Sequence, residues 1–253
     1  MRFAGRPGDV DPGAVPSVPL PEGDTLMTDL HVAEARRRID HALECSRTPV
    51  MTCSFQPGGL VVLHLLGAAR HEVPVLFVDT GYHFGETLEF KDRMIELWGL
   101  NVRIVRPADD VQRHEANVGR LHRTNADLCC AQRKTGPLFE ALAGHDAWLT
   151  GLRRDQAESR RATGVVERRV LPDGSVLSKA NPIVDWTAAE LEAYMERHEI
   201  PVHPLIGQGF PSIGCAPCTN RPSAADDDRS GRWAGTKTEC GLHTRLDPVA
   251  SLR

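Results

Sequence analysis

The chain has 253 residues, of which 41% are hydrophobic and 25% charged, a composition typical of a soluble globular protein with one substantial core. Its formal net charge of −4 argues against a nucleic-acid binder that acts through its overall field, but permits a local basic pocket for a small anion. No apolar run approaches the ~20 residues of a membrane helix, and the N-terminus has no apolar signal core, so we expect a cytoplasmic protein with neither a nucleic-acid nor a membrane partner.

The first part of the chain predicts a tail, a helix and a strand. Residues 1–25 are expected to form a disordered tail, because prolines alternate with glycines and few large apolar residues are present. The segment His31–Glu44 carries apolar residues at helical spacing, and Val50–Ser54 has the composition of a strand.

Strand and helix patterns then alternate. Short strands separated by helices predict an α/β fold, with an open, mostly parallel sheet and helices on both faces. An irregular polar stretch interrupts the alternation before Cys129. The expected helices are Leu60–Ala69, Glu86–Trp98 and Cys129–Leu142, and the expected strands are Val73–Val78, Val102–Val105 and Ala147–Thr150.

The last third of the chain changes character. A hairpin is expected within Val165–Leu177, and a helix is expected to begin after Thr187, with Glu190 as its capping-box partner. Regular periodicity then fades, and long irregular segments in compact proteins are either functional or disordered. We therefore predict an α/β nucleotide-binding domain over residues 26–206 and an irregular C-terminal segment over 207–253.

Two loops at the expected sheet edge suit a nucleotide. Ser54, Gly58 and Gly59 join a strand to a helix, and free amides at a helix N-terminus favour an anion where small residues permit close approach. The loop lacks the Gly-Lys-Ser/Thr of a Walker A motif, and an ordinary strand-to-helix turn is the alternative. Asp79 and Thr80 end the next strand at the same edge, where a capped helix start is the alternative.

Four of the seven cysteines occur in two close pairs, which in a cytosolic chain favours metal or redox chemistry over disulfides. Cys129 and Cys130 are adjacent, and two residues separate Cys215 from Cys218. Together they form a four-thiolate set that suits zinc or an iron–sulfur cluster, and spacing alone does not distinguish the two metals. The alternative is that these cysteines serve as small buried apolar residues. Lys134 lies within about one helical turn of the first pair, where it can contact an anionic substrate.

Basic residues recur where the predicted topology places the pocket. Guanidinium groups bind phosphate and sulfate oxygens through paired donors, although any single arginine is more often a solvated surface charge. The recurring residues are Arg153, Arg154, Arg160, Arg161, Arg229 and Arg232.

A lone cysteine, Cys240, lies in the C-terminal segment with no cysteine partner nearby in the sequence. A reactive thiol needs access and an electropositive setting, which Arg232 and His243 can supply. A spare surface thiol is the alternative. The two remaining cysteines, Cys45 and Cys53, are expected to be structural.

Four ordered blocks between about Val50 and His243 resemble the assimilatory adenylyl-sulfate and phosphoadenylyl-sulfate reductases. This resemblance implies an adenine nucleotide alpha hydrolase-like fold. The blocks are Asp79-Thr80-Gly81-Tyr82-His83-Phe84, Gly151-Leu152-Arg153-Arg154-Asp155-Gln156, Pro182-Ile183-Val184-Asp185-Trp186 and Glu239-Cys240-Gly241-Leu242-His243.

Within that family, a Cys-Cys-x-x-Arg-Lys block together with Cys-x-x-Cys marks the branch that carries a [4Fe–4S] cluster, one per chain, and uses adenosine 5′-phosphosulfate. The resemblance implies that Cys129, Cys130, Cys215 and Cys218 are cluster ligands and that Cys240 is the nucleophile. The residues that match the family's substrate-contacting positions are Lys134, Arg160, Arg229, Arg232 and His243, with Arg161 as an alternative to Arg160.

The reaction that the resemblance implies begins with attack of the Cys240 thiolate on the sulfur of the phosphosulfate. AMP leaves, and an external dithiol, thioredoxin by family precedent or a glutaredoxin-like one, releases sulfite from the S-sulfocysteine, in sulfate assimilation towards cysteine. The loop after Ser54 reads Phe-Gln-Pro-Gly-Gly, where family members often carry Phe-Gly-Ala-Glu, so its individual contacts stay open. The oligomeric state, including a homo-oligomer, also stays open.

Three other functions compete with this interpretation. The nearest is the same chemistry on the 3′-phosphorylated substrate. An ATP pyrophosphatase of the same fold would carry a Ser-Gly-Gly-x-Asp-Ser type of loop, whose aspartate and terminal serine are missing here. A zinc-bound nucleotide sensor is the alternative that is not an enzyme.

Overall fold

The computed structural model describes residues 22–222, 229–233, 237 and 239–243. Its centre is one six-stranded sheet in the order β3-β2-β1-β4-β6-β5, in which neighbouring strands are parallel except for the antiparallel pair β5 and β6. The predicted open, mostly parallel sheet is therefore confirmed. The strands are β1 Pro49–Thr52, β2 Val75–Val78, β3 Val102–Val105, β4 Ala147–Leu149, β5 Val166–Val170 and β6 Val176–Ala180.

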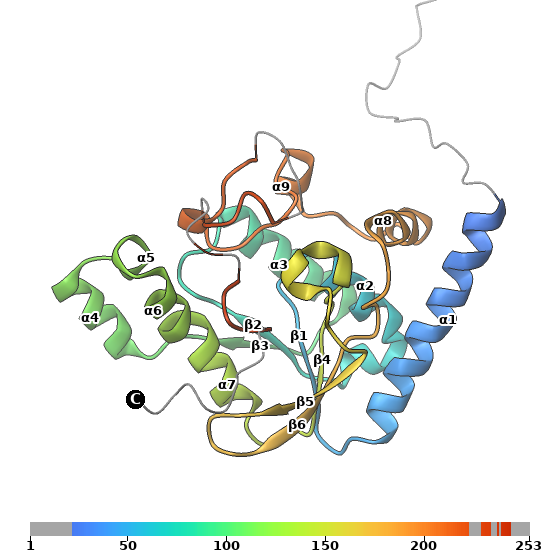
Figure 1. Cartoon of the computed structure of the whole chain (residues 1–253), viewed down its shortest axis with the longest axis horizontal. Helices are drawn as coiled ribbons and strands as arrows, with labels where there is room; N and C mark the ends of the chain where they lie inside the picture. Colours follow the sequence, from blue (N-terminus) through green and yellow to red (C-terminus); the bar gives the residue numbers. More distant parts are fainter. Residues whose placement is uncertain (1–21, 223–228, 234–236, 238, 244–253) are drawn as a thin grey trace, which may run out of the picture.

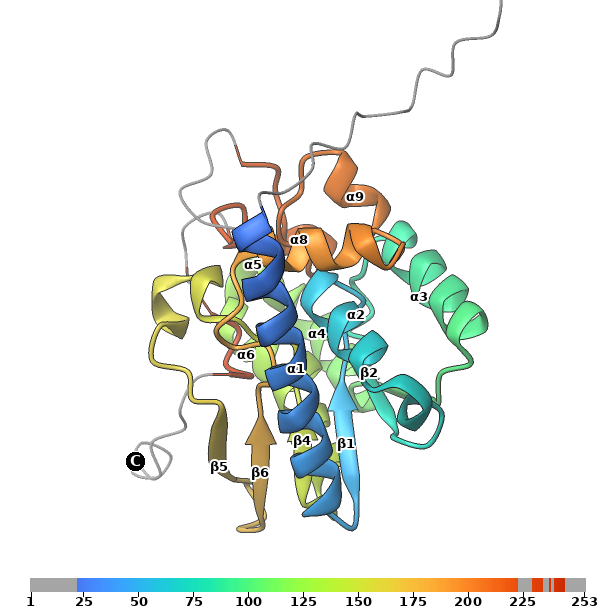
Figure 2. The same ribbon diagram turned by 90° about the vertical axis from the view of Figure 1, so that its right-hand side faces the viewer.

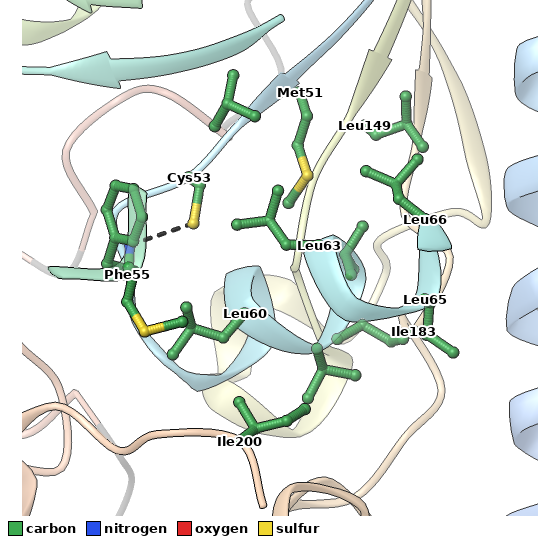
Figure 3. Packing of buried hydrophobic residues seen from close by; sticks show 14 of the residues in the cluster. Met51, Cys53, Phe55, Leu60, Leu63, Leu65, Leu66, Leu149, Ile183 and Ile200 are labelled. Carbon is green, nitrogen blue, oxygen red and sulfur yellow. Dashed lines mark hydrogen bonds between the residues drawn. The ribbon is translucent and has the colours of Figure 1, made fainter. Parts of the chain in front are cut away.

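Helices cover both faces of the sheet, as expected (Figure 1). On one face a core cluster joins α1, α2, α3 and α8 to the sheet through residues such as Ile39, Leu63 and Met94 (Figure 3 shows the part around α2). On the other face, Leu138 of α7 packs with Trp148, Cys240 and Leu242. The helices are α1 Glu22–Glu44, α2 Pro57–Leu65, α3 Gly85–Trp98, α4 Asp109–Val118, α5 Leu121–Thr124, α6 Ala126–Cys130, α7 Gly136–Leu142, α8 Ala188–Arg197 and α9 Pro204–Gly207.

The first helix starts earlier than the sequence pattern predicts. It begins at Glu22, directly after the last proline of the tail, so residues 22–25 are helical where a disordered tail was expected. Residues 1–21 of the predicted tail lie outside the described part of the chain.

Two further differences lie near the cysteines. The stretch expected to be irregular contains α4 and α5. The helix expected over Cys129–Leu142 is formed by α6, a five-residue π-helical turn over Ala131–Thr135, and α7. Such π-turns within α-helices are frequent at functional sites.

The described part of the C-terminal segment lies over the carboxyl ends of the strands, the usual ligand-binding edge of an open α/β sheet. In Figure 2, the arrowheads of β1 and β6 point towards α8 and α9 and the orange segment around them. After α9, the described residues up to 222 form only the 3-10 turn Ala216–Cys218 and isolated bridges, including one between His83 and Cys215. No helix within the described ranges is both long and apolar enough to cross a membrane.

Candidate active site

A pocket of about 850 Å³ opens at the carboxyl ends of the strands, between the sheet, α8 and the C-terminal segment. It brings together, from distant parts of the chain, most of the residues predicted from the sequence to contact substrate or to act as the nucleophile. Those that line it are Ser54, Gly58, Gly59, Thr80, Lys134, Arg160, Arg229, Arg232, Cys240 and His243.

The loop between β1 and α2 forms one wall of this pocket. Phe55 adopts a left-handed conformation, with φ +56°, and its amide donates to the Cys53 sulfur at 3.2 Å (Figure 3). A Cβ atom on Gly58 would lie 2.3 Å from the Gly151 carbonyl oxygen, so only glycine permits the two strand-end loops to touch. The first turn of α2 has no acidic side chain, which leaves its amides suited to an anion.

Among the residues nominated for anion or substrate contacts, Asp79, Arg154 and Arg161 do not line the pocket. Arg154 instead donates from its Nε to the Thr163 carbonyl at 2.9 Å. The Asp79 carboxylate accepts a hydrogen bond from the Gly81 amide at 3.0 Å and lies 3.4 Å from Arg106, so it shapes the turn after β2. Arg161 is exposed and pairs with Glu158, whereas the neighbouring Arg160 is buried and lines the pocket. Of these two arginines, the structure therefore places only Arg160 where a ligand can reach it.

Arginines from two parts of the chain make the pocket electropositive. Arg160 follows β4, whereas Arg229 and Arg232 come from the C-terminal segment and pack over the Trp233 ring. Burial, and next the charge of Arg160, lower the pKa of Arg229 to about 10, which still leaves it charged at neutral pH. Buried cations of this kind are stabilised by an anionic ligand.

Cys240 lies in the same pocket with 7% of its surface exposed. Burial alone would raise its pKa, but Lys134, the Leu242 amide and Arg229 outweigh burial and lower the pKa of the thiol. Cys240 is therefore buried yet biased towards the thiolate, as a nucleophile requires. By contrast, burial raises the pKa of Cys53 to about 12, which fits a structural residue.

His243 closes the end of the pocket behind the nucleophile. Its ring stacks on Trp148 with centroids 5.8 Å apart, and its Nδ1 has no hydrogen-bond partner among the described residues. Burial, followed by the charges of Lys179, Arg160 and Lys134, holds the pKa of His243 well below its usual value. The imidazole is therefore neutral and offers the pocket a hydrogen bond without a charge.

The four paired cysteines surround a second, smaller cavity beside the pocket. Cys129, Cys130, Cys215 and Cys218 all line it, and Lys134, Arg232 and Cys240 line both spaces. Burial, and next the neighbouring cysteines Cys130 and Cys215, raise the pKa of Cys129 to about 12. One buried and three half-buried thiols without disulfides, beside the cations Lys134 and Arg232, form a donor set that fits a metal group able to hold them as thiolates.

Zinc and iron–sulfur clusters both take thiolate ligands. Among the described residues, no three side chains of His, Cys, Asp or Glu lie close enough to share a single metal ion.

A buried network supports the cysteine cavity from behind. Arg133, in the π-turn, pairs with Glu115 of α4 at 2.5 Å and donates to the Thr80 carbonyl at 2.9 Å. The Tyr82 hydroxyl donates to the same carboxylate at 2.7 Å, and the Thr80 hydroxyl lies 3.2 Å from the Cys215 sulfur. This network joins the turn after β2 to both cysteine pairs.

Sequence reasoning missed the roles of three residues that shape the site. Gln56 connects the β1–α2 loop to Ile213, Glu239 pairs with two pocket arginines, and Trp233 lines both cavities. Arg153, noted only as one of several arginines, is buried in the pocket wall. Glu239 was visible as the residue before Cys240, but its sequence position gives no sign of its partners.

Comparison with known proteins adds family information to this geometry. Residues 48–221 match the family model described as phosphoadenosine phosphosulfate reductase domain. The chain is 46% identical over 188 residues to the adenosine 5′-phosphosulfate reductase of Streptomyces coelicolor, covering 72% of this chain and 77% of that protein. It is 42% identical over 198 residues to adenosine 5′-phosphosulfate reductase 1 of Bacillus subtilis, covering 77% and 83%.

Solved structures share the fold at lower identity. A phosphoadenylyl-sulfate reductase from Candida auris superposes with a TM-score of 0.65 at 24% identity, over 81% of this chain and all of that one. An FMN adenylyltransferase from Candida glabrata superposes with a TM-score of 0.61 at 12% identity, over 81% and 69%. The fold is therefore shared with enzymes of different chemistry, and the site must decide the function.

Proposed function

The chain belongs to the phosphoadenosine phosphosulfate reductase family, and from that premise we propose that it reduces adenosine 5′-phosphosulfate to sulfite and AMP. One observation supports this proposal most directly. A single pocket holds Cys240, a buried cysteine whose pKa is lowered towards the thiolate, together with arginines from both halves of the chain. This juxtaposition suits attack by sulfur on an anionic substrate. The names of the similar curated proteins support the substrate.

The chemistry follows from the charges around Cys240. Its thiolate attacks the sulfur of the sulfate group, a new S–S bond forms, and the bond from that sulfur to the phosphate oxygen breaks. AMP leaves with the electron pair, and Lys134, Arg160 and Arg229 stabilise the charge that develops on the leaving oxygen. The product on the chain is an S-sulfocysteine at Cys240. Neutral His243 does not compete with the substrate for these cations.

An external dithiol completes the turnover in this proposal. Its first thiolate attacks the Cys240 sulfur and expels sulfite, and its second thiol resolves the mixed disulfide, so that the dithiol becomes a disulfide and Cys240 a thiol again. We propose thioredoxin or a similar protein as this dithiol, in sulfate assimilation. A cytoplasmic location fits the reduced cysteines that the reaction needs.

We further propose that Cys129, Cys130, Cys215 and Cys218 hold one [4Fe–4S] cluster. When bound, such a group places a fixed charge distribution beside the pocket, and the reaction needs no change in its oxidation state. Lys134 and Arg232 line both the cysteine cavity and the pocket. Their positive charges therefore interact both with a group bound by the cysteines and with a substrate in the pocket. Purified protein should be brown and contain iron, whereas a colourless protein with stoichiometric zinc would favour the nucleotide sensor.

Trapping the intermediate tests the proposed function. The protein is incubated with adenosine 5′-phosphosulfate without reductant, and peptide mass spectrometry should show a sulfonate on Cys240. Cys240→Ser should abolish sulfite formation but keep the brown colour, whereas Cys218→Ser should lose the colour. Sulfite production by Cys240→Ser would overturn the mechanism.

The 3′-phosphorylated substrate is the second candidate, since the solved structure from Candida auris is named for it. Turnover of both substrates with the same reductant decides between them. We expect a clear preference for adenosine 5′-phosphosulfate, in line with the relatives that are 42% and 46% identical.

A further inference from the structure

Glu239, the residue before the nucleophile, is buried between two arginines of the pocket. Its Oε1 accepts from Arg160 Nε at 2.9 Å and from the Ser159 hydroxyl at 3.1 Å. Its Oε2 accepts from Arg160 Nη2 at 3.3 Å and from Arg229 Nη2 at 3.1 Å. Both carboxylate oxygens are therefore bound, and the contacts join residues far apart in the sequence.

This ion pair differs from the exposed ion pairs of the chain. The side chains of Glu239, Arg160 and Arg229 are 7%, 9% and 12% exposed, whereas those of the nearby pair Glu158 and Arg161 are 76% and 75% exposed. An exposed pair contributes little, but removing one partner of a buried pair leaves an uncompensated charge in a poorly solvated site. The Glu239 contacts are therefore strong enough to hold a segment in place.

The backbone on the other side of Cys240 is also held. Arg169 of β5 donates to the Leu242 carbonyl at 3.1 Å. Gly241, between this contact and Cys240, has φ +91°, a conformation that suits glycine. Cys240 thus lies on a short stretch of backbone that is bound on both sides, through the Glu239 side chain and the Leu242 carbonyl.

We propose that Glu239 is a positioning residue, whose carboxylate holds Cys240 in the pocket by binding the same two arginines that bind the anionic substrate. The inference rests on the proposed function for the identity of that substrate. In the proposed reaction the Glu239 carboxylate has two effects. Glu239 fixes the position of the nucleophile, and it competes with the anion for Arg160 and Arg229.

Each of these two effects predicts a change in one kinetic constant. Without the carboxylate the turn is released, so the thiolate spends less time aligned with the sulfate and kcat falls. The freed arginines bind the substrate at least as well as before, so KM does not rise and is expected to fall. A residue that only maintains the fold would raise KM or lower the amount of folded protein instead.

The test compares Glu239→Gln with Glu158→Gln, which removes the carboxylate of the exposed pair. In the substrate-free holoenzyme we expect amide hydrogen exchange within 239–243 to become roughly tenfold faster or more in Glu239→Gln and to stay unchanged in Glu158→Gln. Alkylation of Cys240 by iodoacetamide, followed by peptide mass spectrometry, should accelerate in the same variant. Amide exchange is the deciding readout, because alkylation also depends on the thiolate fraction.

Kinetics with adenosine 5′-phosphosulfate give the second readout. We expect kcat of Glu239→Gln to fall by about tenfold or more without a rise in KM. If Glu239→Gln does not fold, Glu239→Asp keeps the charge on a shorter side chain and should show the same changes to a smaller degree. Unchanged exchange together with unchanged kcat would overturn the inference. If the unmodified protein reduces no phosphosulfate, the proposed function fails, while the exchange comparison still tests the role of Glu239.

Discussion

The side chain of Gln56 is hydrogen-bonded in both directions to the backbone of Ile213. Its Nε2 donates to the Ile213 carbonyl at 2.7 Å, and the Ile213 amide donates to its Oε1 at 2.9 Å. Gln56 precedes α2 in the β1–α2 loop, and Ile213 lies two residues before Cys215. One amide group therefore connects the loop whose backbone amides suit an anion with the segment proposed to bind the cluster.

Replacing Gln56 should loosen the cysteine segment. Gln56→Ala removes both bonds, and Gln56→Glu places a carboxylate against the Ile213 carbonyl. Both variants should accelerate amide exchange around Ile213 by about tenfold or more, given roughly 1 kcal/mol for each of the two bonds. The metal content of the purified protein should fall as well. The exposed Gln112→Ala on α4 serves as the control. Exchange at Ile213 that matches this control would show that the paired bonds do not hold the segment.

Gly58 should tolerate no larger side chain. A Cβ there would lie 2.3 Å from the Gly151 carbonyl, whereas one on Gly207 of α9 would meet nothing within 4 Å. We expect Gly58→Ala to lower the free energy of unfolding by about 1–3 kcal/mol and to reduce activity, because the two strand-end loops must separate. Urea unfolding and turnover measure the two effects. Equal results for Gly58→Ala and the control Gly207→Ala would contradict the close approach.

Lys134 should control the reactivity of Cys240. It is the main charge that opposes burial and lowers the pKa of the thiol, so Lys134→Met should raise that pKa and slow alkylation near neutral pH. The pH profile of Cys240 alkylation should have its midpoint below the ~8.5 of a free cysteine in the unmodified protein and shift upwards in the variant. Arg113→Met, which removes an exposed charge of α4, should leave the midpoint unchanged. The same midpoint in all three proteins would exclude Lys134 from this role.

His203 should make the fold sensitive to acid. The Leu205 amide donates to His203 Nδ1 at 3.2 Å, so the ring carries its proton on Nε2, 3.0 Å from the Thr87 hydroxyl. Burial lowers the pKa of this histidine, and Glu86 opposes the shift. Below about pH 6.5 the unfolded state therefore binds more protons than the folded one, and the free energy of unfolding falls as the pH decreases.

The pH dependence of unfolding isolates this contribution. His203→Asn keeps an acceptor near the Leu205 amide but does not titrate, so it should be less stable at pH 7 by about 1–3 kcal/mol and lose less stability between pH 7 and pH 5. Urea unfolding at the two pH values gives both quantities. Parallel losses in the variant and the unmodified protein would assign the acid sensitivity to other histidines.

The sheet and its edge could be predicted because local patterns specify them. Apolar runs such as Val75–Val78 indicate buried strands, and Thr187 with Glu190 forms the capping box expected at the start of α8. The predicted sheet edge gathers Lys134, Arg229 and the other lining residues, because the carboxyl ends of parallel strands meet there.

What could not be predicted depends on long-range pairing. α4 buries only Val111 and Glu115. Because one of these two positions is a glutamate, the sequence lacks the row of apolar residues at helical spacing by which a helix is recognised. The partner of that glutamate, Arg133, is 18 residues away. The partners of Glu239 and Gln56 are further still along the chain, at Arg160 and Ile213. Such pairs carry no periodicity, so only the folded chain reveals them.

The π-turn over Ala131–Thr135 places one extra residue between two functional surfaces. Here the Gly136 amide bonds to the Ala131 carbonyl, so the turn holds one residue more than an α-helical turn. Before it, Cys129 and Cys130 face the small cavity, and after it Leu138 and Leu142 belong to the core on that face of the sheet. Because the wider turn absorbs the extra residue locally, the two flanking helices keep nearly the phase of one continuous α-helix. Deleting one residue here would therefore leave both surfaces in place and displace the two cations within the turn, Arg133 and Lys134.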